Sequence, residues 1–376
     1  MLFRWLPLFI ALVALLGGCG GSGSRDTTVD SAAIARQAEL RADSLRWARA
    51  DSLLATLSPR QRLGMLLMPA VYTRSDDATM AALTAYALDD HVGGIILLKG
   101  DTLSAIAVAD TLRRLGREDM LIAIDAEWGL GMRLADAATY PVNSELGLTA
   151  TGASMREYGR EVGRQARRLG IDMVLGPVVD VVPDSISSFL KRRSLGGDAG
   201  RVGELACSYA EGVESEGVIS VAKHFPGHGG IVSDSHRTLP VLYKSLHELE
   251  GSDLLPFRMY VARGLSAIMI GHVAVPAIDT EQRSAALSES VMTDLLRDDM
   301  KFKGLILTDA MNMAGAGGAS ASEAIAAGAD LVLAPVSTAA ALADLEQALA
   351  AGRLTQQDID SRVRRILYYS LRKQKR

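Results

Sequence analysis

The sequence predicts an α/β protein, a (β/α)8 barrel of the TIM type that forms a single catalytic domain. Short apolar runs alternate along the chain with segments of helical periodicity. The runs are apolar on both faces, which is typical of parallel strands covered by helices. Several runs end in an ionisable residue, as strands do at the C-terminal mouth of such a barrel. A doubly wound sheet is the alternative, but no GxGxxG motif follows any run, so nucleotide binding has no support.

Seven runs are strand candidates: residues 93–98, 121–125, 173–179, 219–223, 267–271, 305–309 and 331–334. The eighth strand is expected near residues 65–70. Polar residues stand at or directly after the ends of five runs: Asp125, Asp180, His224, His272 and Asp309. The chain ends soon after a predicted helix at 359–371, which leaves no room for a second, sandwich domain. We therefore expect residues 57–376 to form the barrel.

The composition is that of an ordinary globular protein. The 376 residues are 48% hydrophobic and 22% charged, which is enough to build a large core. A net charge of −4 and a pI near 5.9 argue against a nucleic acid as partner.

The first 19 residues have the features of a lipoprotein signal peptide. Arg4 precedes an apolar run at 6–16 that is too short to span a bilayer comfortably. The run leads into the sequence LGGC at positions 16–19, which resembles a bacterial lipobox whose cysteine, Cys19, becomes the lipidated first residue. An uncleaved anchor or an ordinary signal peptide is the alternative. A lipid on Cys19 would make the protein an exported, membrane-anchored lipoprotein on the periplasmic side, and Gly20 after the cysteine favours the outer membrane.

Residues 20–56 are expected to connect this anchor to the barrel. Residues 20–30 are rich in Gly, Ser, Thr and Asp and should form a flexible tether. Helical periodicity over 31–57 predicts one or two helices. If Cys19 carries lipid, Cys207 has no cysteine left to pair with, so we expect no disulfide and a small core residue at Cys207.

The most informative segment reads KHFPGHGGIVSDSHRTLP, at residues 223–240. It holds three of the six histidines and is rich in Gly and Pro, so it must be a loop. His224 and His228 have the spacing of a helical zinc pair, but Pro226 and Gly227 make a helix implausible, and no metal is expected. Asp234 and His236 form a better pair, because a carboxylate two residues away can orient an imidazole as a general acid/base. Histidines that merely cap backbone groups are the alternative.

These motifs resemble the signature of glycoside hydrolase family three, in the branch of bacterial β-N-acetylglucosaminidases. KHFPGHG, followed by DSH and LP, carries the resemblance, which extends from Leu57 to Leu371. The resemblance implies that His236 serves as acid/base, where other glycosidases use a carboxylic acid. It also implies an oligosaccharide substrate and no cofactor.

The nucleophile implied by the resemblance is Asp309. It lies in GLILTDAMNMAG, residues 304–315, which matches the family's V-T-D-x-x-x-M context. From its position alone, Asp309 could also be a helix N-cap.

Sugar-binding residues follow from three further matches. IAIDAEWGLGMRL resembles the family's D-x-E-G-G-x-x-x-R run, with Asp125 and Arg133 as sugar contacts and Trp128 in place of a glycine. RRSLG resembles R-S-F-G and supplies Arg193.

Lys223 and His224 match residues that both contact the sugar. Adjacent strand residues normally face opposite sides, so a bend is expected here, with a cis peptide bond at Phe225–Pro226. His228 is expected to be structural, and His272 either a sugar contact or a support behind one.

The function implied is that of a retaining exo-β-N-acetylglucosaminidase acting by double displacement on peptidoglycan fragments or chitooligosaccharides. A neutral histidine would not repel an anionic acceptor, so phosphorolysis is a conceivable side activity. A β-glucosidase of the same family is one alternative. A catalytically dead, membrane-tethered carbohydrate-binding protein is the other.

Replacing Cys19 with Ser should release the protein from membranes or block its maturation, because the lipid is the only anchor that the sequence predicts. Fractionation of cells that express each form, followed by immunoblotting, measures this. If the unaltered protein were wholly soluble in the cytoplasm, the predicted localisation would be wrong.

Overall fold

The computed structural model describes residues 31–231 and 238–374. Of the described residues, those up to Asp43 and those from Ser44 onward belong to two separate units. The strands all belong to the second unit. Cys19, Asp234 and His236 lie outside the described residues.

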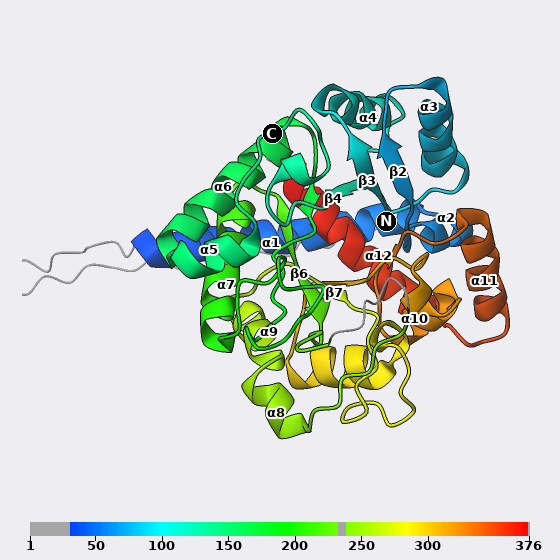
Figure 1. The fold of residues 1–376 in the computed structure, drawn as a ribbon. Coiled ribbons are helices and arrows are strands. Elements are labelled where there is room, and N and C mark those ends of the chain that lie inside the picture. Colours follow the sequence, from blue (N-terminus) through cyan, green and yellow to red (C-terminus); the bar gives the residue numbers. More distant parts are fainter. Residues whose placement is uncertain (1–30, 232–237, 375–376) are drawn as a thin grey trace, which may run out of the picture. The chain divides into compact units, whose positions relative to one another are not determined.

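The second unit contains an eight-stranded parallel barrel, the TIM-like fold that the sequence predicts (Figure 1). Seven strands form one sheet in chain order: β2 (Ala70–Thr73), β3 (Gly94–Gly100), β4 (Leu121–Ile124), β5 (Met173–Val174), β6 (Ile219–Phe225), β7 (Ala267–Ile270) and β8 (Leu305–Thr308). β1 (Leu67–Met68) pairs in parallel with β9 (Val332–Leu333). Because only Pro69 separates β1 from β2, the two act as one barrel strand. A parallel bridge between Leu307 and Leu331 joins β8 to the β9 segment.

The strand positions follow from the apolar runs. All four residues of β4, β7 and β8 are buried, and so are all seven of β6, because helices cover one face and the barrel interior the other. Each of the seven predicted runs overlaps an observed strand, and β3 and β6 each extend two residues beyond the predicted end. The eighth, expected near 65–70, extends further, to Thr73.

Helices surround the strands in Figure 1 and alternate with them along the chain. The α-helices are α2 (Pro59–Gly64), α3 (Asp77–Thr84), α4 (Thr102–Arg114), α5 (Asn143–Thr149), α6 (Gly152–Arg168), α7 (Ala199–Ser215), α8 (Leu246–Gly251), α9 (Leu254–Ala262), α10 (Ala321–Ala327), α11 (Thr338–Ala350) and α12 (Gln356–Ser370). Between β7 and β8 the helix is a π-helix, Ser290–Asp299. Polar N-caps begin many of them, as where Asp101 accepts from the Ser104 amide at 2.8 Å. Cys207 is fully buried in α7, as predicted.

The segment before the barrel is one helix, α1 (Ser31–Thr56). In its second half, Trp47 stacks on Tyr368 of α12 with ring centroids 4.0 Å apart, and Arg364 lies 4.4 Å above the Trp47 ring. This end of α1 is therefore packed on the last helix of the barrel. Within the described part of the chain, no helix combines the length and the apolar character needed to cross a membrane.

Candidate active site

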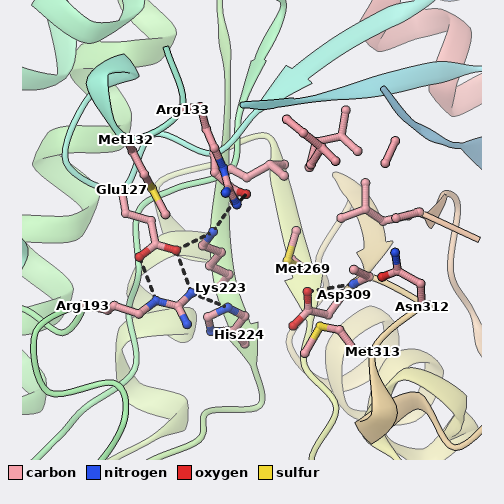
Figure 2. Close-up of a pocket in the computed structure, with 18 of the residues that line it drawn as sticks. Glu127, Met132, Arg133, Arg193, Lys223, His224, Met269, Asp309, Asn312 and Met313 are labelled. Atoms are coloured by element: carbon pink, nitrogen blue, oxygen red, sulfur yellow. Dashed lines mark hydrogen bonds and ion pairs between the residues drawn. The ribbon is translucent and has the colours of Figure 1, made fainter. Parts of the chain in front are cut away.

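A pocket of about 380 Å³ opens where the strands end, at the C-terminal mouth of the barrel (Figure 2). Its size is at the lower end of the range of about 300–1,000 Å³ that ligand sites occupy. One part of the wall is ionic and the other is apolar. The ionisable lining residues are Asp125, Glu127, Arg133, Arg193, Lys223, His224, His228 and Asp309. The apolar lining residues include Ile96, Leu98, Met132, Leu175, Met269, Met313 and Leu333.

The pocket brings together all six site residues predicted from the sequence that lie within the described residues: Asp125, Arg133, Arg193, Lys223, His224 and Asp309. They come from separate strand ends and loops. Lys223 and Asp125, for example, are 98 residues apart in the chain but in direct contact. The parallel barrel causes this convergence, because the carboxyl ends of its strands meet at one rim.

Lys223 is the centre of the ionic wall. It is 2% exposed, and its Nζ lies 2.9 Å from Asp125 Oδ1 and 2.8 Å from Glu127 Oε1. Asp125 also accepts a hydrogen bond from Arg133. Burial alone would lower the pKa of the Lys223 ammonium, but the two carboxylates raise it on balance. The lysine is therefore a charged clamp between two acidic strand-end residues.

Arg193 extends the network on the other side of Glu127. Its Nε and Nη2 donate to the two Glu127 carboxylate oxygens at 2.8 and 2.7 Å, a bidentate pair. Burial would raise the pKa of Glu127, but Lys223 and Arg193 outweigh it and lower the pKa to about 2. Glu127 is thus ionised at neutral pH and holds both cations in place.

Burial keeps His224 neutral, and its two neighbours fix its tautomer. Its Nδ1 lies 2.8 Å from Asp180 Oδ2, and its Nε2 lies 3.2 Å from the Arg193 guanidinium. A carboxylate can only accept and a guanidinium can only donate, so Nδ1 carries the proton and Nε2 the lone pair. Burial lowers the pKa of this imidazole below its ordinary value, despite the nearby Asp180.

Lys223 and His224 both reach the pocket although they are neighbours in β6 (Figure 2). The peptide bond between them is cis, and the predicted cis bond at Phe225–Pro226 is also present. The register between β6 and β7 shifts at this place, between Ala222 and Phe225. The bend therefore begins two residues earlier than the sequence indicated.

Asp309 directly follows β8 and lies across the pocket from the network in Figure 2. Its Oδ1 accepts from the Ala310 amide at 2.8 Å, and its own amide donates to Ile270. Burial would raise the pKa of this carboxyl, but His224, His272 and the Ala310 amide lower it below its ordinary value. No α-helix begins at Asp309, so the alternative of an N-cap does not apply; a turn follows, and then a short 3-10 helix at Ala314–Ala316.

Two residues of the site were not among the predicted sugar contacts and catalytic groups. Glu127 stands two positions after Asp125. In an extended chain this spacing places the two side chains on the same side. Asp180 is fully buried and accepts from the amides of His224 and His228 as well as from the His224 ring. It holds the start of the histidine loop in place. Its position directly after an apolar run is the feature of the sequence that could have revealed it.

The remaining candidates have defined places. Trp128 is half-buried and lines the pocket. His272 is buried behind the site, with Nδ1 3.2 Å from Ser284 Oγ and Nε2 3.2 Å from the Ala310 carbonyl. It therefore supports the backbone next to Asp309. The His228 amide donates to Asp180, while its ring lies against the pocket.

The barrel and its pocket define the class of protein, an enzyme of the (β/α)8 type. Buried carboxylates and forked cations at its mouth suit a ligand with many hydroxyl groups, as in a glycosidase.

Comparisons with known proteins identify the family. The model of the glycosyl hydrolase family 3 N terminal domain matches residues 59–369. Beta-hexosaminidase LpqI of Mycobacterium tuberculosis is 33% identical over 384 residues, with 96% of each chain covered. The chain belongs to glycosyl hydrolase family 3, and it is a glycosidase.

Two longer relatives are also similar. The beta-N-acetylglucosaminidase/beta-glucosidase of Cellulomonas fimi is 30% identical over 341 residues, covering 86% of this chain and 59% of that protein. The structure of a family 3 β-N-acetylglucosaminidase from Paenibacillus sp. str. FPU-7 is 31% identical with a TM-score of 0.78, covering 85% of this chain and 63% of that one. The chain therefore spans about three fifths of the length of these two relatives.

Replacing Glu127 with Gln should destabilise the fold at neutral pH by about 3–5 kcal/mol, because Lys223 and Arg193 lose their shared carboxylate in a buried place. The folded-state pKa of Glu127, about 2, is depressed from its ordinary 4.5. Its stabilisation is therefore present above pH 4.5 and lost as the pH falls toward 2. Urea unfolding at several pH values should show the difference between the two proteins shrinking over this window.

Glu118→Gln is the matched control, since Glu118 is exposed. It should change the free energy of unfolding by less than about 0.5 kcal/mol at every pH. A Glu127→Gln protein as stable as the unaltered one at pH 7 would contradict the network.

Proposed function

We propose that the protein is a retaining exo-β-N-acetylglucosaminidase, with Asp309 as nucleophile and His236, oriented by Asp234, as acid/base. The observation that carries the proposal is the unequal pairing of charges around the pocket. Arg133, Lys223 and Arg193 are paired with Asp125 and Glu127, and Asp180 contacts His224. Asp309, by contrast, forms no ion pair among the described residues.

The other three carboxylates of the site are Asp125, Glu127 and Asp180. Each is fixed by at least two charged or hydrogen-bonding neighbours, and Asp180 is fully buried. None of them can easily leave its partners to attack a sugar. Asp309 needs no such rearrangement, because it faces the pocket and its pKa lies below the ordinary value, so that it is ionised at neutral pH.

The reaction proceeds in two steps. Asp309 attacks the anomeric carbon while His236 transfers a proton to the departing glycosidic oxygen, so that a glycosyl ester forms and the leaving group departs as an alcohol. His236, now neutral, takes a proton from water, and the water oxygen displaces Asp309 from the anomeric carbon. Two inversions give net retention. The sugar ring is held by five residues of the pocket: Asp125, Arg133, Arg193, Lys223 and His224.

The substrate class follows from the pocket and from the relatives. The pocket has the volume of a small ligand site and a mixed wall, with cations and carboxylates for hydroxyl groups and methionines for apolar substituents. The related proteins are named beta-hexosaminidase and β-N-acetylglucosaminidase. One relative is also named beta-glucosidase, so the glucoside is the second substrate to test.

The proposal includes the organisation of the chain. Residues 1–19 are a lipoprotein signal peptide, residues 20–56 tether the enzyme, and residues 57–376 form one catalytic domain. The enzyme would be anchored through Cys19 on the periplasmic side, in reach of peptidoglycan fragments.

Hydrolysis of p-nitrophenyl N-acetyl-β-glucosaminide beside the matching β-glucoside tests the substrate. We expect a clearly higher kcat/KM for the N-acetylglucosaminide. Preference for the glucoside would favour the β-glucosidase, and no turnover of either would favour the dead carbohydrate-binding protein.

Asp309→Ala should abolish turnover, because the loss of the covalent route removes an acceleration worth on the order of 8 kcal/mol or more. Steady-state kinetics, with circular dichroism to verify folding, measure this. Asp298→Ala, at an exposed carboxylate nearby in the chain, should keep full activity. Substantial activity in Asp309→Ala would place the nucleophile elsewhere.

His236→Ala should be slow rather than dead, since acid/base help is worth roughly 10²–10⁴-fold. The loss should be smallest for activated aryl leaving groups, which need little protonation, and largest for sugar leaving groups. Asp234→Asn should show a weaker version of the same pattern. Equal losses across a series of leaving groups would mean that His236 binds the substrate or supports the structure of the site and does not transfer a proton.

A further inference from the structure

We propose that the ion pair between Lys244 and Asp253 positions the loop that carries Asp234 and His236, because it joins the two ends of that loop. Neither Lys244 nor Asp253 is among the described residues that line the pocket, so both act through the loop and not on the substrate. The effect on catalysis rests on the proposed function, whereas the connection between the loop ends does not.

The Lys244–Asp253 pair is a fixed point beside the loop. The Asp253 side chain is 0% exposed, and that of Lys244 is 26% exposed. Oδ2 of Asp253 accepts hydrogen bonds from Lys244 Nζ and, at 2.6 Å, from the Ser252 hydroxyl group. Lys244 Nζ also lies 3.2 Å from Ser252 Oγ. A buried carboxylate in such a pair cannot lose its cation without remaining as an uncompensated charge, so the two side chains stay together.

The first end of the loop passes directly over this pair. Gly227 and Gly229 both have positive φ angles, +113° and +45°. A Cβ on Gly227 would lie 2.7 Å from Asp253 Cβ, and one on Gly229 would lie 2.3 Å from Asp253 Oδ1 and 3.2 Å from Lys244 Nζ. Only glycine allows the backbone to approach a carboxylate this closely. The position of Asp253 therefore determines where the chain enters the loop.

The second end of the loop carries Lys244 itself. The Leu242 amide donates to the Ala274 carbonyl at 2.8 Å, and the Ala274 amide donates to the Pro240 carbonyl at 2.9 Å. Two residues after Leu242, the Lys244 side chain reaches Asp253 and comes close to Gly229. The Lys244–Asp253 pair thus links the entry of the loop to its exit. A loop with both ends fixed has fewer conformations open to it, which limits where Asp234 and His236 can lie.

The proton transfer is the step that depends on this restriction. A general acid must lie within hydrogen-bond reach of the departing oxygen. A displacement of roughly 1 Å can reduce the rate by about 10²-fold. Asp309 follows β8 and is not part of this loop, so its attack on the anomeric carbon does not need the pair. Loss of the pair should therefore slow those substrates whose leaving group needs a proton.

Lys244→Met tests the inference, because it removes the ammonium group and keeps most of the apolar stem. We expect kcat/KM for the disaccharide of β-linked N-acetylglucosamine to fall roughly 10–100-fold. For an activated aryl N-acetylglucosaminide, which needs little protonation, the fall should be less than about 3-fold. Partial unfolding would lower the amount of active enzyme and would reduce both values by one common factor.

Arg297→Met is the matched control. Arg297 pairs with Asp330, whose side chain is 0% exposed while that of Arg297 is 14% exposed. Asp330 precedes β9, so this pair lies at the end of the barrel opposite the mouth. The variant should lose stability but slow both substrates equally, if at all. An equal loss for both substrates in Lys244→Met, or no loss, would overturn the inference.

Hydrogen–deuterium exchange gives a readout that does not depend on activity. The amides of Gly227, Ile231 and Leu242 are hydrogen-bonded at the two ends of the loop. They should exchange faster in Lys244→Met than in the unaltered protein or in Arg297→Met. Lys244→Gln retains a donor for Asp253 and replaces the Met variant if that protein does not fold; it should show the same changes to a smaller extent. Unchanged exchange in a folded Lys244 variant would mean that the pair does not hold the loop ends.

His236→Ala, measured beside these variants, separates this inference from the proposed function. If His236→Ala slowed both substrates equally while exchange rose in Lys244→Met, the proposed acid/base would be wrong and the link between the loop ends would be supported. A leaving-group dependence in His236→Ala that is missing in Lys244→Met would support the acid/base and contradict the positioning role.

Discussion

Lys223 is buried between Asp125 and Glu127, and the geometry of the site depends on this contact. A lysine that is 2% exposed keeps its charge only because two carboxylates surround it. The same carboxylates must then be neutralised on their far sides, which Arg133 and Arg193 do. The result is a continuous chain of alternating charges that fixes five side chains from different parts of the sequence.

This chain of charges prepares the pocket for chemistry. Every cation in it contacts at least one carboxylate, so the side chains are held in place before a sugar binds. The carboxylate that stands outside the pairing is Asp309, across the pocket. Fixed dipoles and charges that need no rearrangement during the reaction are the usual source of stabilisation in such sites. The proposed sugar-binding residues are therefore also the residues whose pairing leaves the proposed nucleophile, Asp309, without an ion-pair partner among the described residues.

Much of this arrangement could be predicted from the sequence. Apolar runs that end in Asp125, His224 or Asp309 indicated both the strands and the rim, because parallel strands are buried on both faces and end together. What could not be predicted were contacts made across the barrel. Glu127 was recognised in its motif, but its pairing with Lys223 and Arg193 depends on segments distant in the chain.

The histidine loop shows the same limit. Its residue types indicated a functional loop, and Pro226 argued against a helical metal pair. Only the folded chain brings Asp180 under the loop, where it holds His224 and His228 at one point. A single buried carboxylate thus determines the tautomer of one histidine and faces the ring of the other.

The central claim is that the reaction passes through a glycosyl ester on Asp309. A fluorinated N-acetylglucosaminide whose glycosyl-enzyme hydrolyses slowly would capture this state, and mass spectrometry of the protease-digested protein would locate it. The account predicts a single added sugar on the peptide that contains Asp309. A sugar attached at Glu127 or at another carboxylate, or no adduct together with inversion of the anomeric configuration in the product, would contradict it.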